Sequence, residues 1–127
     1  MRFDLIDHLP FVKIILINEG KESELANVLL DTGSASTVIP AEIAVELGLD
    51  SLPTDKILRI HGVGGMEYVY EKHIDKITLG SLVVKDVAIQ VGSLDYGFGI
   101  NGILGMDFMI KAEVLIDIKN GWITKAI

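Results

Sequence analysis

The stretch that decides the fold runs from Val28 to Pro40 and reads VLLDTGSASTVIP. Residues 28–30 are apolar and predict the end of a buried strand, and the four residues that follow, 31–34, are turn formers. Taken alone, Asp-Thr-Gly-Ser indicates a turn. Because Asp31 stands directly at the end of an apolar strand, its carboxylate is also the first candidate for chemistry.

The rest of the chain predicts a mostly-β fold with one or two short helices. Ile and Val together outnumber Leu, and β-branched side chains favour strands. The 13 glycines lie largely between the apolar runs, where turns are needed. The predicted strands are residues 11–17, 25–30, 56–60, 67–74, 77–79, 82–90, 103–105, 114–118 and 122–126, and the predicted helices are residues 41–47 and 107–111.

Length and charge narrow the class of protein. The 127 residues suit one domain, residues 1–127. The net charge of −7 argues against nucleic-acid binding and against an anionic membrane surface. No apolar stretch approaches the roughly 20 residues of a membrane-spanning helix. The absence of cysteine excludes disulfides and zinc–thiolate sites and fits a reducing compartment, so we expect a cytoplasmic protein. From the charge and the lack of a long apolar stretch we expect neither nucleic-acid nor membrane partners.

Two further segments are candidates for function. Residues 61–66, HGVGGM, form the glycine-rich tip of a predicted hairpin, which is either an ordinary surface turn or a mobile lid over a ligand. They are not a phosphate loop, because no Gly-Lys-Ser/Thr follows. Residues 103–107, ILGMD, predict a core strand and the start of a helix, with Asp107 as the N-cap.

The chain resembles the retropepsin-like aspartic proteases, in particular cellular and bacterial members. The resemblance is carried by the order and spacing of the Val28–Pro40 stretch, the GVGG hairpin and GILGMDF (residues 102–108). The resemblance covers roughly residues 10–110. It implies a closed retropepsin-like acid-protease β-barrel in which residues 60–67 form a flap. Residues 103–105 would then flank the active-site loop within the same subunit.

The resemblance also assigns roles to residues. Asp31 would be the catalytic aspartate, Thr32 would hold two active-site loops together across a dimer axis, and Gly33 would present its carbonyl to substrate. We further expect the Ser34 hydroxyl to donate a hydrogen bond to the Asp31 carboxylate. The predicted catalytic residues are Asp31, Thr32 and Gly33, and the predicted substrate-binding residues are Ser34, Gly62, Val63, Gly64, Gly65 and Ile103.

The chemistry of peptide hydrolysis agrees with these roles. It needs one carboxylate to accept a proton from water and a second to donate a proton to the peptide carbonyl oxygen. The chain has one Asp-Thr-Gly and no second Asp-Ser/Thr-Gly. We therefore expect a homodimeric aspartic endopeptidase acting on peptides or proteins, each subunit supplying one Asp31. The three histidines match no zinc motif, so we expect no metal and no other cofactor.

The chain departs from retroviral members in two places. Where those have an acidic residue and an arginine that pair, this sequence has Ala35 and Met106. The end of the chain, residues 114–127, predicts a hairpin rather than a single interface strand. We expect the apolar terminal residues to form the dimer interface, namely Phe3, Leu5, Ile6, Trp122, Ile123 and Ile127. The alternatives are a non-catalytic retropepsin-fold module that dimerises or binds a peptide strand, and an unrelated small β-barrel.

Overall fold

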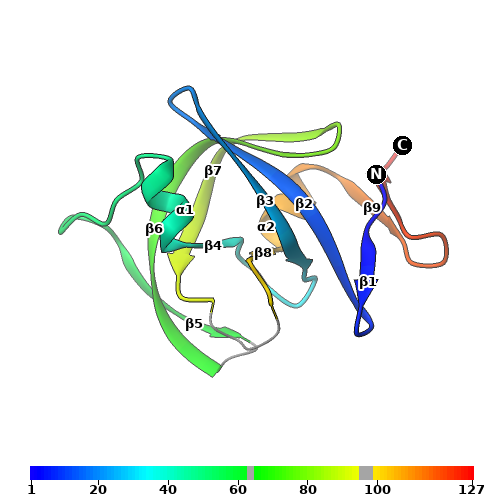
Figure 1. The fold of residues 1–127 in the computed structure, drawn as a ribbon, viewed down its shortest axis with the longest axis horizontal. Coiled ribbons are helices and arrows are strands. Elements are labelled where there is room, and N and C mark those ends of the chain that lie inside the picture. The colour runs from blue at the N-terminus through cyan, green and yellow to red at the C-terminus, as the bar shows by residue number, and fades with distance from the viewer. Residues whose placement is uncertain (63–64, 95–98) are drawn as a thin grey trace.

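The structure is a computed structural model that describes residues 1–62, 65–94 and 99–127. Ten strands and two helices occupy these residues (Figure 1). Their bounds are β1 (Asp4–Ile6), β2 (Leu9–Asn18), β3 (Lys21–Leu30), β4 (Val38–Pro40), α1 (Ala41–Glu46), β5 (Ile57–Gly62), β6 (Gly65–Leu79), β7 (Leu82–Gly92), β8 (Gly102–Leu104), α2 (Met106–Lys111), β9 (Val114–Asp117) and β10 (Trp122–Lys125).

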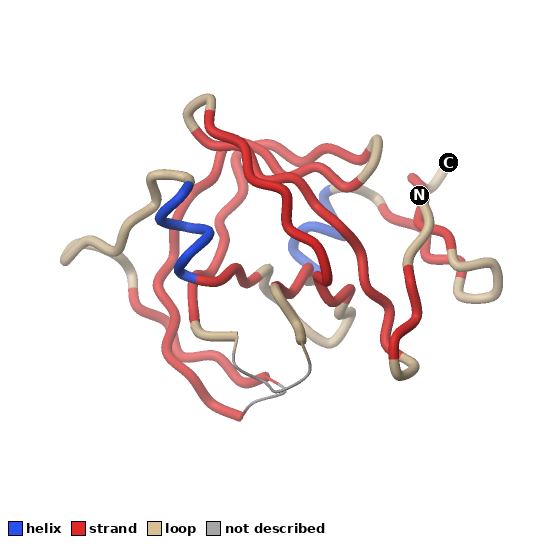
Figure 2. The backbone as a smooth tube through the Cα atoms, in the orientation of Figure 1, coloured by secondary structure: helices blue, strands red, loops and turns tan. Residues whose placement is uncertain are grey.

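Eight of the strands form one sheet in the order β1-β2-β3-β8-β4-β7-β6-β5. β2 pairs with β6 as well as with β3, so the sheet closes on itself, and Figure 2 shows the resulting ring of strands. Two pairings are parallel, β3 with β8 and β4 with β7. The parallel pairing of β3 with β8 brings the end of the Val28–Leu30 run beside residues 102–104. The predicted contact between residues 103–105 and the Asp31 loop is therefore confirmed.

The apolar residues pack in two clusters on opposite faces of the strands. The main core includes Val28 and Leu30 of β3, Ile39 of β4 and Phe108 of α2, which is fully buried. In β3 and β4 the residues of the smaller cluster alternate with those of the main core, so the two sets point to opposite faces of the strands. The smaller cluster consists of Phe11, Leu29, Val38, Ile100 and Ile103, with Ile60 and Leu94 packed against it. We call this cluster the apolar wall.

The predicted elements agree with the structure in type and differ at their ends. Both helices form, at residues 41–46 and 106–111. Two strands predicted at residues 67–74 and 77–79 are one strand, β6, because Lys76 between them is paired with Lys85 of β7. Strands β1 and β4, each only three residues long, were not predicted.

The C-terminal residues form a separate hairpin of β9 and β10. The first residues of the chain lie along the free side of β10, where Met1 and Ile123 exchange hydrogen bonds of 2.9 and 2.7 Å and the Phe3 N–H donates to the Gly121 carbonyl. Both termini therefore lie together at one side of the molecule (Figure 1). Of the terminal residues predicted to form the interface, Phe3 and Ile123 are buried within their own chain, whereas Leu5, Ile6, Trp122 and Ile127 are exposed.

No helix within the described residues has the length and hydropathy needed to cross a membrane.

Candidate active site

The Asp31 loop is held by the backbone of the strand beside it. The N–H of Asp31 donates to the carbonyl of Leu104 over 3.0 Å, which continues the parallel β3–β8 ladder by one residue. The side chain of Asp31 is half-buried, and its Oδ1 accepts a hydrogen bond of 2.9 Å from the N–H of Gly33. The Ser34 N–H closes the turn on the Asp31 carbonyl over 3.1 Å. The carboxylate is thus fixed at the end of a buried strand.

Gly105 allows the second loop to approach the first. A Cβ atom at this position would lie 2.5 Å from the carbonyl oxygen of Ser36 and 2.8 Å from that of Ser34, so only glycine fits. Two backbone hydrogen bonds join the loops here, from Met106 N–H to Ser34 (2.8 Å) and from Asp107 N–H to Ala35 (3.2 Å). At the two positions where the retroviral charge pair is missing, backbone contacts therefore connect the loops.

Thr37 and Asp107 form a polar contact that was not predicted from the sequence. The Thr37 hydroxyl donates to Oδ1 of Asp107 over 2.7 Å, and the Thr37 N–H donates to Oδ2 over 3.0 Å. The same hydroxyl accepts a bond of 3.1 Å from the N–H of Gly105. Asp107 was predicted as the N-cap of its helix. It lies instead in the first turn of α2, whose N-cap is Gly105, and Oδ1 also accepts from the N–H of Phe108.

The predicted hydrogen bond from Ser34 to Asp31 is wrong. The Ser34 hydroxyl donates to the carbonyl of Ser36 over 2.8 Å, because the turn points its side chain along the loop rather than back to the carboxylate. The donor that reaches Asp31 is the backbone N–H of Gly33. Thr32 is exposed on the outside of the loop and makes no side-chain hydrogen bond with the described residues.

Ile103 belongs to the apolar wall, on the Asp31 side of the sheet. In β3, Leu29 alternates with the core residues Val28 and Leu30, and Asp31 follows Leu29 by two positions. Strand alternation therefore places Leu29 and Asp31 toward the same face. Ile103 pairs with Leu29 in register and is buried beside it, so the structure brings this predicted substrate-binding residue next to the Asp31 loop.

The predicted flap is described in part. β5 and β6 form an antiparallel hairpin in which Gly62 pairs with Gly65. Gly65 has a φ of +95°, a conformation that side-chain-bearing residues rarely adopt. The predictions for Val63 and Gly64 lie outside the described residues.

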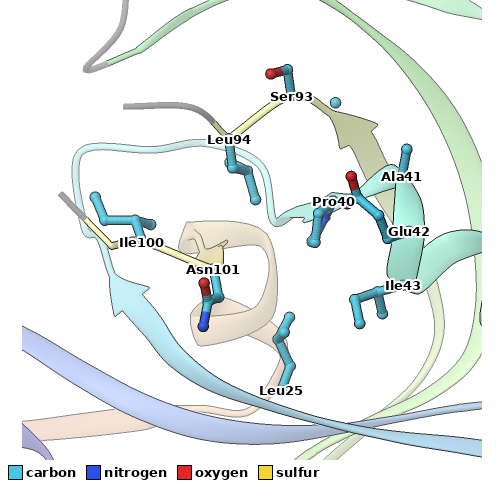
Figure 3. Close-up of a pocket in the computed structure, with 10 residues that line it drawn as sticks. Leu25, Pro40, Ala41, Glu42, Ile43, Ser93, Leu94, Ile100 and Asn101 are labelled. Atoms are coloured by element: carbon cyan, nitrogen blue, oxygen red, sulfur yellow. The ribbon is translucent and has the colours of Figure 1, made fainter. Parts of the chain in front are cut away.

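A cavity of about 610 Å³ lies beyond the apolar wall. Figure 3 shows Leu94, Pro40 and Ile43 pointing into a common space, with Ile100 at its edge. Leu94 and Ile100 contribute to both the cavity and the wall. Asp31 is not among the residues that line it, so the cavity continues the apolar surface away from the carboxylate.

Comparison with known proteins decides the family. The family model for aspartyl proteases matches residues 15–108, which include the Asp31 loop and the Gly105 turn. The chain belongs to the aspartyl protease family. Over 98 residues it is 35% identical to polyporopepsin from Irpex lacteus, a match that covers 73% of this chain and 27% of that protein. The chain thus corresponds to about a quarter of that relative's length.

A solved structure agrees with this family assignment in its fold. A retropepsin-like aspartic protease from Rickettsia conorii superposes with a TM-score of 0.63 at 19% sequence identity, covering 91% of this chain and 82% of that one. The predicted fold class, a mostly-β retropepsin-like fold with two short helices, is confirmed.

Proposed function

We propose that the protein is a homodimeric aspartic endopeptidase that hydrolyses peptide bonds with a water molecule activated between two Asp31 carboxylates, one from each subunit. Two carboxyl groups about 3 Å apart cannot both be ionised, so they share one proton. The ionised group accepts a proton from the attacking water. The protonated group donates to the peptide carbonyl oxygen, and the two roles then exchange as the amine leaves.

The observation that carries this proposal is the fixed position of Asp31. Its backbone is bonded to Leu104, its carboxylate is oriented by the Gly33 N–H, and Gly105 lets the neighbouring loop pack against it. The loop therefore presents a single carboxylate at the surface of the chain. Since the mechanism needs two, a second copy of the chain must supply the other.

The surface beside the loop supports a dimer. A groove of about 410 Å³ has Thr32 at one side and is otherwise lined mainly by apolar residues of α2 and β9. Ile110 and Leu115, which line it, are 67% and 55% exposed. β9 pairs only with β10 among the described residues, so its outer edge is open to a partner strand. We propose that two copies meet here, with β9 beside its symmetry mate and the two Thr32 side chains near the axis.

The predicted substrate contacts fit this arrangement. Gly33 is exposed next to Asp31, so its carbonyl is open to a peptide backbone. The half-buried Ile60 and Leu94 would contact apolar side chains near the scissile bond, and the buried Ile103 belongs to the apolar wall against which they pack. The hairpin around Gly62 and Gly65 would lie over the bound peptide, as a flap.

Digestion of a peptide library by the wild-type chain and by the Asp31→Asn variant tests the proposal. Cleavage by the wild type alone supports it. Equal cleavage by both would exclude the aspartic mechanism. Binding without cleavage by either would favour the alternative, a peptide-binding module of the same fold.

A further inference from the structure

Two polar residues continue the row of paired residues that begins in the apolar wall. Paired residues on neighbouring strands share a face, so a row of partners across the sheet can be followed strand by strand. From Leu29 the row passes to Ile103 and Val38, then to Gln90 of β7 and Glu71 of β6. The first three residues belong to the apolar wall. Gln90 and Glu71 therefore form the polar end of the surface on which Asp31 lies.

Gln90 carries an unpartnered polar atom. Its side chain is buried, with 4% of its surface exposed, and its Oε1 has no hydrogen-bond partner in the described part of the chain. Its Nε2 donates to Oε1 of Glu71 over 3.3 Å. Because a carboxylate only accepts hydrogen bonds, this contact fixes the orientation of the amide and leaves the carbonyl oxygen unpaired. A buried acceptor without a donor costs about 1–3 kcal/mol of stability, so folding alone does not favour glutamine here.

Glu71 is the accessible member of the pair. Its side chain is half-buried, and it takes part in none of the ion pairs between described residues. Neither of the two lysines nearest along the chain forms an ion pair with Glu71 among the described residues. Lys72 is bonded to Asp55 over 2.8 Å, and Lys56 contributes its backbone carbonyl to the N–H of Glu71. Gln90 thus donates a hydrogen bond to a carboxylate that has no ion-pair partner among the described residues.

We propose that Glu71, oriented by Gln90, binds a basic side chain of the peptide substrate, lysine or arginine. This inference rests on the proposed peptidase function and names the substrate class of that site. Strands in a sheet are about 4.8 Å apart and an extended peptide advances about 3.3 Å per residue. Four strand steps separate Leu29 from Glu71, so the basic residue lies within about six residues of the scissile bond. The net charge of −7 favours such substrates also at long range.

Paired peptides test the proposal. Each pair has the same apolar residues at the cleavage site and differs at one position, lysine in one member and norleucine in the other. The position is moved through six residues on either side. We expect wild type to prefer lysine about tenfold in kcat/KM at one position at least, since a hydrogen bond to a charged group is worth about that factor. Glu71→Gln and Gln90→Leu should each reduce this preference.

The control variant is Glu22→Gln, which removes the same charge from an exposed residue at the far end of β3. It should keep the preference for lysine. Gln90→Leu should also unfold at the same temperature as wild type or higher, because it removes the unpartnered oxygen. A residue with a merely structural role would instead lower the unfolding temperature when replaced.

The failures of the two proposals can be told apart. If wild type cleaves peptides but prefers lysine at no position, or if the preference survives Glu71→Gln, the basic-substrate proposal is wrong and the peptidase proposal stands. If nothing is cleaved, the peptidase proposal fails. Fluorescence anisotropy with the same peptides then tests the proposal that Glu71 binds a basic side chain. Tighter binding of the lysine member that depends on Glu71 would support it, and equal binding of both members would overturn it.

Discussion

Thr37 and Asp107 lie 70 residues apart in sequence and are joined by two hydrogen bonds, a hydroxyl bond of 2.7 Å and a backbone bond of 3.0 Å. Thr37 is fully buried and is connected through its hydroxyl to the N–H of Gly105 as well. The pair therefore fixes the end of the Asp31 loop against the start of α2. It connects the two segments without the charge pair of the retroviral enzymes.

Replacing Thr37 by valine should weaken the fold and, more strongly, the activity. The variant keeps the shape of the side chain but leaves the Gly105 N–H and Asp107 Oδ1 without the hydroxyl, at a cost of about 1–3 kcal/mol. Thr37→Ser keeps the hydroxyl and is the matched control. Urea unfolding and kcat/KM measure both effects. A valine variant as stable and active as the serine variant would show that the contact has no role.

The stability of the protein should depend on the ion pair of Asp55 and Lys72. The hydrogen bond from Lys72, with a further bond from the Leu52 N–H, lowers the pKa of Asp55. A lowered folded-state pKa stabilises the protein above the unfolded value of about 3.9, and this stabilisation is lost as the pH falls through the lower folded value. Asp55→Asn should therefore be less stable than wild type at pH 7, and the difference should shrink below about pH 4. A difference that stays constant down to pH 2 in thermal unfolding would contradict this account.

The flap hairpin should be sensitive at Gly65. Gly65→Val forces a β-branched residue into a positive φ in open space, so the strain lies in the backbone alone. Gly20, in the β2–β3 turn, has a φ of +78° and equally open surroundings, which makes Gly20→Val a matched control. Both variants should lose similar stability, but only Gly65→Val should reduce turnover severalfold. Equal turnover in the two variants would remove the case for a flap.

The proposed interface can be tested at Leu115. Leu115→Asp places a charge on the open edge of β9 and should weaken the dimer about tenfold or more. Leu52→Asp, at an equally exposed residue in a loop, should not. Sedimentation and specific activity over one dilution series measure both properties, and a specific interface should bury at least about 1,000 Å². Truncation after residue 121 is a poor test, because it removes Ile123 from the core. Unchanged association of the Leu115 variant would place the interface elsewhere.

The sequence predicts the fold well because its strongest signals are local. The apolar run before Asp31, the glycine turns and the short amphipathic helices each follow from neighbouring residues, and their order carried the family resemblance. Long-range polar contacts could not be predicted in this way. Nothing near Thr37 indicates that its partner is Asp107, and the orientation of Ser34 depends on the path of the loop.

The burial of Phe3 and Ile123 was not predicted, for a related reason. Phe3 and Ile123 are apolar wherever they pack, and the sequence does not show that the N-terminus pairs with β10 of its own chain. Gln90 was missed because a polar residue within an apolar strand carries no sign of which face it occupies. The register of β7 between β4 and β6 places it on the Asp31 side.

The most direct test of the central claim mixes wild-type chains with Asp31→Asn chains under conditions in which subunits exchange. If each active site needs one Asp31 from each subunit, activity at constant total protein varies with the square of the wild-type fraction. An equal mixture then retains about a quarter of the activity of a sample that contains the same total amount of protein, all of it wild type. If one chain were sufficient, the mixture would retain about half. The two-subunit mechanism predicts the quadratic curve, and a straight line through the same mixtures would contradict it.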